Sequence, residues 1–126
     1  MVRRVPRRHP RGVFDHGSDP DTRFSLANER TYLAWTRTSL ALVAGAIAVH
    51  SPLLALSKTA ALGLSILLLV LAVVCVQQGW HRWHRVELAL RTGQAMPGFA
   101  GALLLTFGAT VLIAAVAAVT LADALP

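Results

Sequence analysis

The chain has 126 residues, of which 55% are hydrophobic, and carries 12 Lys and Arg against 6 Asp and Glu, a formal net charge of +6. A chain of this length forms one domain. Its long uncharged apolar runs exclude an ordinary soluble domain and predict a membrane protein. The single cysteine, Cys75, excludes an intramolecular disulfide or a thiolate metal cluster, and we expect it to pack as a small hydrophobe.

The first 18 residues are basic and lack helical or strand periodicity. They contain five arginines and two prolines: Arg3, Arg4, Arg7, Arg8, Arg11, Pro6 and Pro10. We expect residues 1–18 to form a disordered cytoplasmic tail that lies against anionic lipid headgroups. Nucleic acid is the alternative partner, and we expect none, because short arginine clusters beside membrane segments commonly serve to set topology.

A helix start follows the tail at Asp19-Pro20-Asp21. Asp19 is a favourable N-cap, and proline suits the first helical position. No helix-breaking residue then follows until Pro52. The first turns, up to about Tyr32, form an amphipathic extension, and a first transmembrane span is expected over residues 33–51.

Two further apolar segments predict a second span over residues 60–80 and a third over residues 99–121. Ser57 or Thr59 can cap the second span. The segment 81–97 between them is basic, and Gly93 and Pro97 close a short helix within it. The fold class is therefore all-α: a three-span membrane domain over residues 19–126, with the amphipathic extension before its first span.

The distribution of basic residues predicts the orientation of the three spans. The N-terminal tail and the second connection are basic, whereas the first connection has only Lys58. The positive-inside rule then places the N-terminus in the cytoplasm and the C-terminus outside. Signal-peptide cleavage after Ala46-Ile47-Ala48 is an alternative, but the apolar stretch begins too far from the N-terminus for it.

Three arginines, Arg23, Arg30 and Arg37, are spaced seven residues apart on the first helix. This spacing drifts by only about 20° per step on a helix, so the three share one face; we call them the arginine row. The face continues as a small-residue row of Ala34, Thr38, Ala41, Gly45 and Ala48. Small residues mark close approach of another helix, so this face is expected to meet a neighbouring helix or a cavity.

The sequence allows two interpretations of the arginine row. Arg37 lies about 6 Å inside the span, counted from Leu33 at about 1.5 Å per residue, so its guanidinium can reach back to lipid phosphates. Alternatively, the row binds anions from within an assembly, because guanidinium stays charged and binds phosphate in bidentate geometry.

Glu29 is the one carboxylate between Asp21 and Glu87. It lies on a different face from the arginine row, so we expect it to form a structural salt bridge with Arg82, Arg85 or Arg91 of the second connection. No second carboxylate adjoins it for acid–base catalysis. The role of Asn28 is left undecided.

His81 and His84 lie three residues apart, but no third metal ligand is evident. We expect an interfacial histidine pair and no metal. The sequence contains no nucleophile–base arrangement, phosphate-binding glycine loop or zinc signature, so neither enzyme activity nor a cofactor is expected.

The run LANERTYLAWTRTSLAL, residues 26–42, closely resembles the signature of the YidH-like small membrane proteins, a bacterial family of unknown function. The upstream Asp21-Thr22-Arg23 fits the same signature. The three-span layout matches over essentially the whole chain after residue 18. The resemblance implies a multi-pass protein of the bacterial inner membrane.

The same domain resembles the membrane part of the vacuolar transporter chaperone, the eukaryotic polyphosphate polymerase complex. That resemblance implies three-helix units in a homo-oligomer, with a trimer as the expected form, and an arginine row that faces a pore for phosphate polymers. The 126 residues carry no expected polymerase domain or phosphate-sensing domain, so we expect no polymer synthesis by this chain. The first hypothesis is an element that binds or passes phosphate or polyphosphate. The second is a non-conducting accessory subunit that binds anionic lipid or a partner protein.

Overall fold

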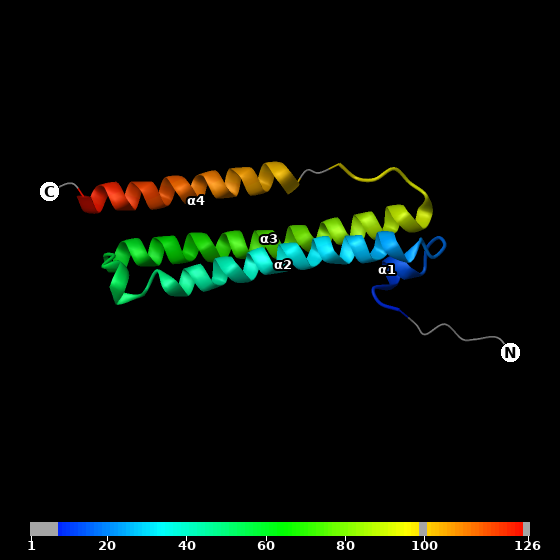
Figure 1. The fold of residues 1–126 in the computed structure, drawn as a ribbon, viewed down its shortest axis with the longest axis horizontal. Helices are drawn as coiled ribbons and strands as arrows, with labels where there is room; N and C mark the ends of the chain where they lie inside the picture. Colours follow the sequence, from blue (N-terminus) through cyan, green and yellow to red (C-terminus); the bar gives the residue numbers. More distant parts are fainter. Residues whose placement is uncertain (1–7, 99–100, 125–126) are drawn as a thin grey trace.

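The computed structural model of the chain describes residues 8–98 and 101–124, and within these ranges the secondary structure is entirely helical. The elements are α1 (Arg11–Phe14), α2 (Thr22–Ala48), the 3₁₀ helix η1 (Pro52–Leu54), α3 (Lys58–Thr92) and α4 (Gly101–Ala124). Helices α2 and α3 form a long antiparallel hairpin, and α4 lies along α3 (Figure 1). The short α1 packs at the C-terminal end of α3 (Figure 1).

Helix α2 begins at Thr22 and not at Pro20, where the sequence predicts it. The cap is Asp21, whose carboxylate accepts a hydrogen bond from the Arg23 amide at 3.0 Å. Asp19, the predicted cap, forms ion pairs with arginine side chains instead. The side chain that reaches an unpaired amide of the first turn thus decides where the helix starts.

Helix α3 continues without a break through the segment predicted as a loop with a short separate helix. Its start confirms the Ser57 cap, whose hydroxyl accepts from the Ala60 amide at 3.2 Å. Its end confirms Gly93, which closes the helix at φ 66°. Between Trp80 and Thr92 the sequence has neither glycine nor proline, so nothing interrupts the helix there. The 35 residues of α3 extend about 50 Å.

A seam of regularly spaced side chains joins α2 to α3. The buried positions of α2 are Asn28, Trp35, Ser39 and Ala46, spaced by seven, four and seven residues. The Ser39 hydroxyl donates to the Ala72 carbonyl at 2.8 Å, and from α3 the Ser65 hydroxyl donates to the Ala46 carbonyl at 3.1 Å. These bonds satisfy buried hydroxyls and fix the register of the hairpin.

Gly79 lets the two helices approach closely in the middle of this seam. A Cβ at position 79 would lie 2.7 Å from the Cβ of Trp35. Any larger side chain would therefore push α2 away from α3, which is the common use of glycine at close helix crossings.

Helix α4 packs on α3, and among the described residues no Cα atom of α4 lies within 8 Å of a Cα atom of α2. Gly108 is the buried position of this contact, since a Cβ there would lie 3.0 Å from Cδ2 of Leu71. Most of the remaining described side chains of α4 are exposed.

The contact between Gly108 and Leu71 shows at which level of the α2–α3 hairpin α4 begins. Gly108 lies beside Leu71, and Gly101 is seven residues earlier, about 10 Å along the helix. The first residue of α4 therefore lies near the level of Gly79, and residues 22–35 of α2 and 79–92 of α3 extend beyond it (Figure 1). We call these two segments the projecting hairpin.

Two helices are long and apolar enough to cross a membrane by length and composition: Lys58–Thr92 and a segment of α4, Leu103–Ala122. They correspond to the second and third predicted spans. The first predicted span, residues 33–51, is not among them, because Arg37 and several hydroxyl residues lower the apolar character of α2. A third span and an interfacial extension thus stay predictions.

The structure differs from the predicted disordered tail where residues 11–14 form α1. Val13 is completely buried, and the Ser18 amide donates to the Arg91 carbonyl at 3.1 Å. The adjacent apolar residues Val13 and Phe14 anchor this otherwise basic segment on α3. Residues 1–7 of the predicted tail lie outside the described residues.

Candidate anion-binding site

A buried polar cluster connects α2 to α3 inside the projecting hairpin. The Ser25 hydroxyl donates to Oε1 of Glu87 at 3.0 Å. The Asn28 amide donates to the Trp83 carbonyl at 3.0 Å and to Oε2 of Glu87 at 3.3 Å. Glu87 is only 2% exposed, so these donors replace the water that a carboxylate normally binds.

Arg91 completes the polar cluster and connects it to the N-terminal segment. Its Nε lies 3.5 Å from Oε1 of Glu87, one helical turn earlier, and one terminal nitrogen lies 3.0 Å from Oδ1 of Asp19. The guanidinium also lies 4.4 Å from the ring centroid of Phe14. A buried arginine is costly unless it is paired, and here two carboxylates and an aromatic face pair it.

The polar cluster fixes the rotation of α2, and thereby the direction of the arginine row. Each row member is two residues from a residue on the α3 side of the helix: Arg23 from Ser25, Arg30 from Asn28 and Arg37 from Trp35. Two residues turn a helix by about 200°, so the row faces away from α3. All three arginines are exposed, as this geometry requires.

The arginine row is a strip of positive charge without internal neutralisation. Seven residues separate successive members by about 10 Å along the helix axis. In the described ranges, none of the three forms an ion pair with a carboxylate. Glu29 is next to Arg30 in sequence but lies about 100° around the helix from it. An anion could therefore contact the row without displacing a protein carboxylate.

The small-residue row is not the surface on which α2 packs against α3. Ala34, Thr38, Ala41 and Ala48 are exposed. Gly45 is half-buried, and a Cβ there would lie 3.6 Å from Cδ1 of Leu68. The buried contact with α3 uses Asn28, Trp35, Ser39 and Ala46, and of the small-residue row only Gly45 borders it. Contact of the small-residue row with a second copy stays a prediction.

The predicted salt bridge of Glu29 differs from the observed pairing. Glu29 is exposed and forms no ion pair within residues 8–98 and 101–124, and Arg91 pairs with Glu87 and Asp19. Of the other expected partners, Arg85 is exposed and Arg82 is half-buried. The expected tie between the two helices exists, but Asn28 forms it, because that residue faces α3 and Glu29 does not.

The histidine pair lies at the same end of α3. His81 is exposed and His84 is half-buried beneath Gly12, where a Cβ would lie 3.8 Å from Nε2 of His84. Among the described residues, no group of three or more His, Cys, Asp or Glu is arranged to hold a metal ion. The neighbouring Trp80 and Trp83 rings stack with centroids 5.3 Å apart.

Sequence reasoning missed the role of Glu87 and left that of Asn28 open. The signal was present in the spacing of Ser25, Asn28, Trp35 and Ser39, which follows the three-four pattern of a helix seam. On such a seam a polar residue must meet a polar partner from the other helix, and Glu87 with Arg91 one turn later is a suitable pair.

The chain is similar to known proteins over more than half of its length. A family model described as "Domain of unknown function (DUF202)" matches residues 23–89. The inner membrane protein YidH of Escherichia coli is 40% identical over 83 residues, 64% of this chain and 71% of YidH. An uncharacterized protein of Mycobacterium tuberculosis is 40% identical over 80 residues, 63% of this chain and 66% of that protein, slightly under two thirds of its length. No solved structure matches the chain significantly.

Proposed function

Since the chain belongs to the DUF202 family of YidH-like proteins, we propose that it is an inner-membrane protein that binds anions along the arginine row of α2. The Escherichia coli relative is an inner membrane protein, and this similarity and the two apolar helices of this chain support the location. A binding or conducting role, without catalysis and without a cofactor, agrees best with an exposed row of arginines.

One observation carries the proposal: the arginine row is exposed and unpaired by carboxylates within the described residues, on the side of α2 away from α3. Charged side chains next to a membrane span need anions, water or protein partners. The polar cluster around Glu87 is internally paired and serves to hold this face outward.

The proposed membrane arrangement has three spans, with the N-terminal end in the cytoplasm and the C-terminal end outside. Helix α1 and the connection from α3 to α4 lie at one end of the molecule, and the end of α4 lies at the other (Figure 1). Three spans cannot enclose a pore alone, so conduction would require a homo-oligomer, and a trimer is the expected form. The exposed small-residue row supports a helix contact between copies.

Phosphate and its polymers are the anions that this row suits best. Guanidinium binds phosphate in bidentate geometry, and spacings of about 10 Å let one extended polyanion contact several arginines. The resemblance to the membrane part of the polyphosphate polymerase complex is a further reason to test polyphosphate first.

The test uses purified protein in liposomes loaded with polyphosphate. Wild type is expected to release polyphosphate, and Arg30→Glu and Arg37→Glu are expected to reduce the flux at least about tenfold, because each reverses a charge on the row. Arg85→Glu is the matched control, since Arg85 is exposed on α3 outside the row. Two results would contradict conduction: equal polyphosphate flux in wild type and all variants, or a wild-type flux no higher than that of loaded liposomes without protein.

A second candidate function is a non-conducting accessory subunit whose arginine row binds anionic lipid or a partner protein. The exposure of the row on a single protomer favours it, because within the described chain no element covers the row. In that case liposomes show no flux. The Arg30→Glu and Arg37→Glu variants instead lose lipid or a partner that purifies with wild type.

A further inference from the structure

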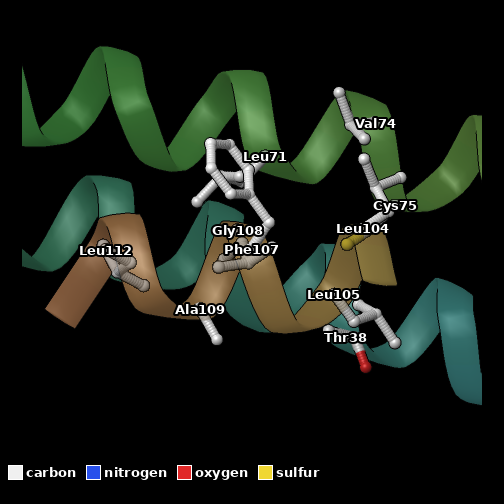
Figure 2. A pocket seen from close by; sticks show the side chains of 11 residues that line it. Thr38, Leu71, Val74, Cys75, Leu104, Leu105, Phe107, Gly108, Ala109 and Leu112 are labelled. Atoms are coloured by element: carbon white, nitrogen blue, oxygen red, sulfur yellow. The ribbon is translucent and has the colours of Figure 1, made fainter. Parts of the chain in front are cut away.

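An apolar groove runs between α2 and α4, with α3 as its floor (Figure 2). It has a volume of about 300 Å³. Thr38 and Leu42 line it from α2, Cys75 from α3, and Leu105 and Ala109 from α4. The groove exists because α4 packs against α3 at Gly108, while the Cα atoms of α2 and α4 stay more than 8 Å apart.

The groove begins close to the N-terminal end of α4. Its α4 wall runs from Leu104 to Leu112, and Leu104 is three residues, about 5 Å, after the first residue of the helix. The groove therefore extends inward from the level at which the projecting hairpin begins. The lining is almost entirely apolar, and an apolar groove that starts near the proposed membrane boundary suits an acyl chain.

The charged residue next to the groove indicates which polar group a molecule bound in the groove would carry. Arg37 directly precedes Thr38 of the groove wall, is exposed, and pairs with no carboxylate among the described residues. Neither α3 between residues 59 and 81 nor α4 before Asp123 has a charged side chain. Arg37 is thus the cation closest in sequence to the groove wall, and its guanidinium suits a phosphodiester.

We propose that the groove binds one acyl chain of an anionic phospholipid whose phosphate is bound by Arg37. The inference rests on the proposed membrane location but not on anion conduction. The apolar chain fills the slot between α2 and α4, and the headgroup lies beside the arginine row, so the lipid connects α4 to α2, which otherwise have no direct backbone contact.

The test counts phosphatidylglycerol molecules retained per protomer by native mass spectrometry in mild detergent, with phosphatidylcholine as the neutral comparison. Wild type is expected to retain one phosphatidylglycerol. Ala109→Leu fills the groove and Arg37→Gln removes the cation, and each is expected to lower retention about tenfold. The matched controls are Ala117→Leu, exposed on α4 away from the groove, and Arg85→Gln, and both should retain lipid as wild type does.

The proposal would be overturned if Ala109→Leu retained as much phosphatidylglycerol as Ala117→Leu, or if Arg37→Gln retained as much as Arg85→Gln. Equal retention of phosphatidylcholine would overturn it too, as would a second copy of the chain bound in a way that Ala109→Leu abolishes. If Ala109→Leu does not fold, Thr38→Leu fills the groove from α2, where the Thr38 hydroxyl bonds only to the Ala34 carbonyl of its own helix. Ala109→Leu leaves the arginine row intact, so lipid loss with unchanged polyphosphate flux separates this inference from the proposed function.

Discussion

At the scale of single residues, Glu87 is the side chain on which the interior of the projecting hairpin depends. It accepts hydrogen bonds from Ser25 and Asn28 and pairs with Arg91. Because Glu87 and Arg91 are both buried, removal of one leaves the charge of the other less compensated. Asp19 still pairs with Arg91 in that case, which limits the loss.

The first expectation concerns this carboxylate. Glu87→Ala should lower the free energy of unfolding by roughly 3 kcal/mol, the usual cost of removing one partner of a buried ion pair. Thermal unfolding in detergent, followed by circular dichroism, measures the change. Glu29→Ala is the control, because Glu29 is exposed and forms no ion pair within the described chain. Equal midpoints for the two variants would show that the buried cluster does not stabilise the fold.

Residue chemistry also explains which part of the site the sequence could predict. The seven-residue spacing of the arginines was sufficient to place them on one face of a helix, and the structure has them on one exposed face. The spacing could not show which side of α2 meets α3. That side depends on Asn28, Trp35 and Ser39, whose partners come from residues more than 30 positions later.

At the scale of elements, the α2–α3 seam depends on a close approach at Gly79. The structure places Trp35 against this glycine, so the backbone of α3 forms part of the packing surface. The same seam holds the arginine row in position, because the row and the buried seam residues Asn28, Trp35 and Ser39 lie on one helix, α2. A change that separates α2 from α3 should therefore disturb the row without touching it.

The second expectation tests this seam. Gly79→Ala places a methyl group that would lie 2.7 Å from the Cβ of Trp35, so the helices must separate. Overpacking of this kind costs about 1 to 3 kcal/mol. Gly63→Ala is the matched control, since a Cβ there meets nothing within 4 Å and gains helix propensity. Unfolding midpoints of both variants give the comparison, and an unaffected Gly79→Ala would contradict the close approach.

The helix boundaries show what local signals can and cannot decide. The N-cap residue Ser57 and the C-cap residue Gly93 were sufficient to predict the two ends of α3, because each residue acts locally on its own helix end. Asp19 and Asp21 were equally plausible caps, and long-range pairing of Asp19 with Arg91 distinguishes them. The docking of α1 was not predictable from periodicity, since it depends on Val13 and Phe14 meeting α3.

At the scale of the whole molecule, the helical hairpin brings the basic N-terminal segment and the basic end of α3 to the same end of the protein. Helix α1, the start of α2 and the end of α3 lie at one end, and η1 and the end of α4 lie at the other (Figure 1). The positive-inside rule predicts that this arginine-rich end lies in the cytoplasm, and that orientation stays a prediction.

The third expectation concerns this orientation. In a Cys75→Ala background, Leu53→Cys should react with an impermeant thiol reagent in intact cells, because Leu53 is 94% exposed in the connection predicted to lie outside. Ser18→Cys, at the opposite end, should react only after the membrane is permeabilised. The reverse pattern would invert the topology, and reaction of both in intact cells would show that the chain does not have opposite ends on opposite sides.

The packing of α4 against α3 has a consequence for biosynthesis. Every contact between α2 and α3 involves residues made before Gly101, and the family match also ends before this residue. A nascent chain can therefore complete the hairpin seam while α4 is still within the ribosome. When α4 emerges, it packs against an already formed α2–α3 hairpin, with Gly108 against Leu71.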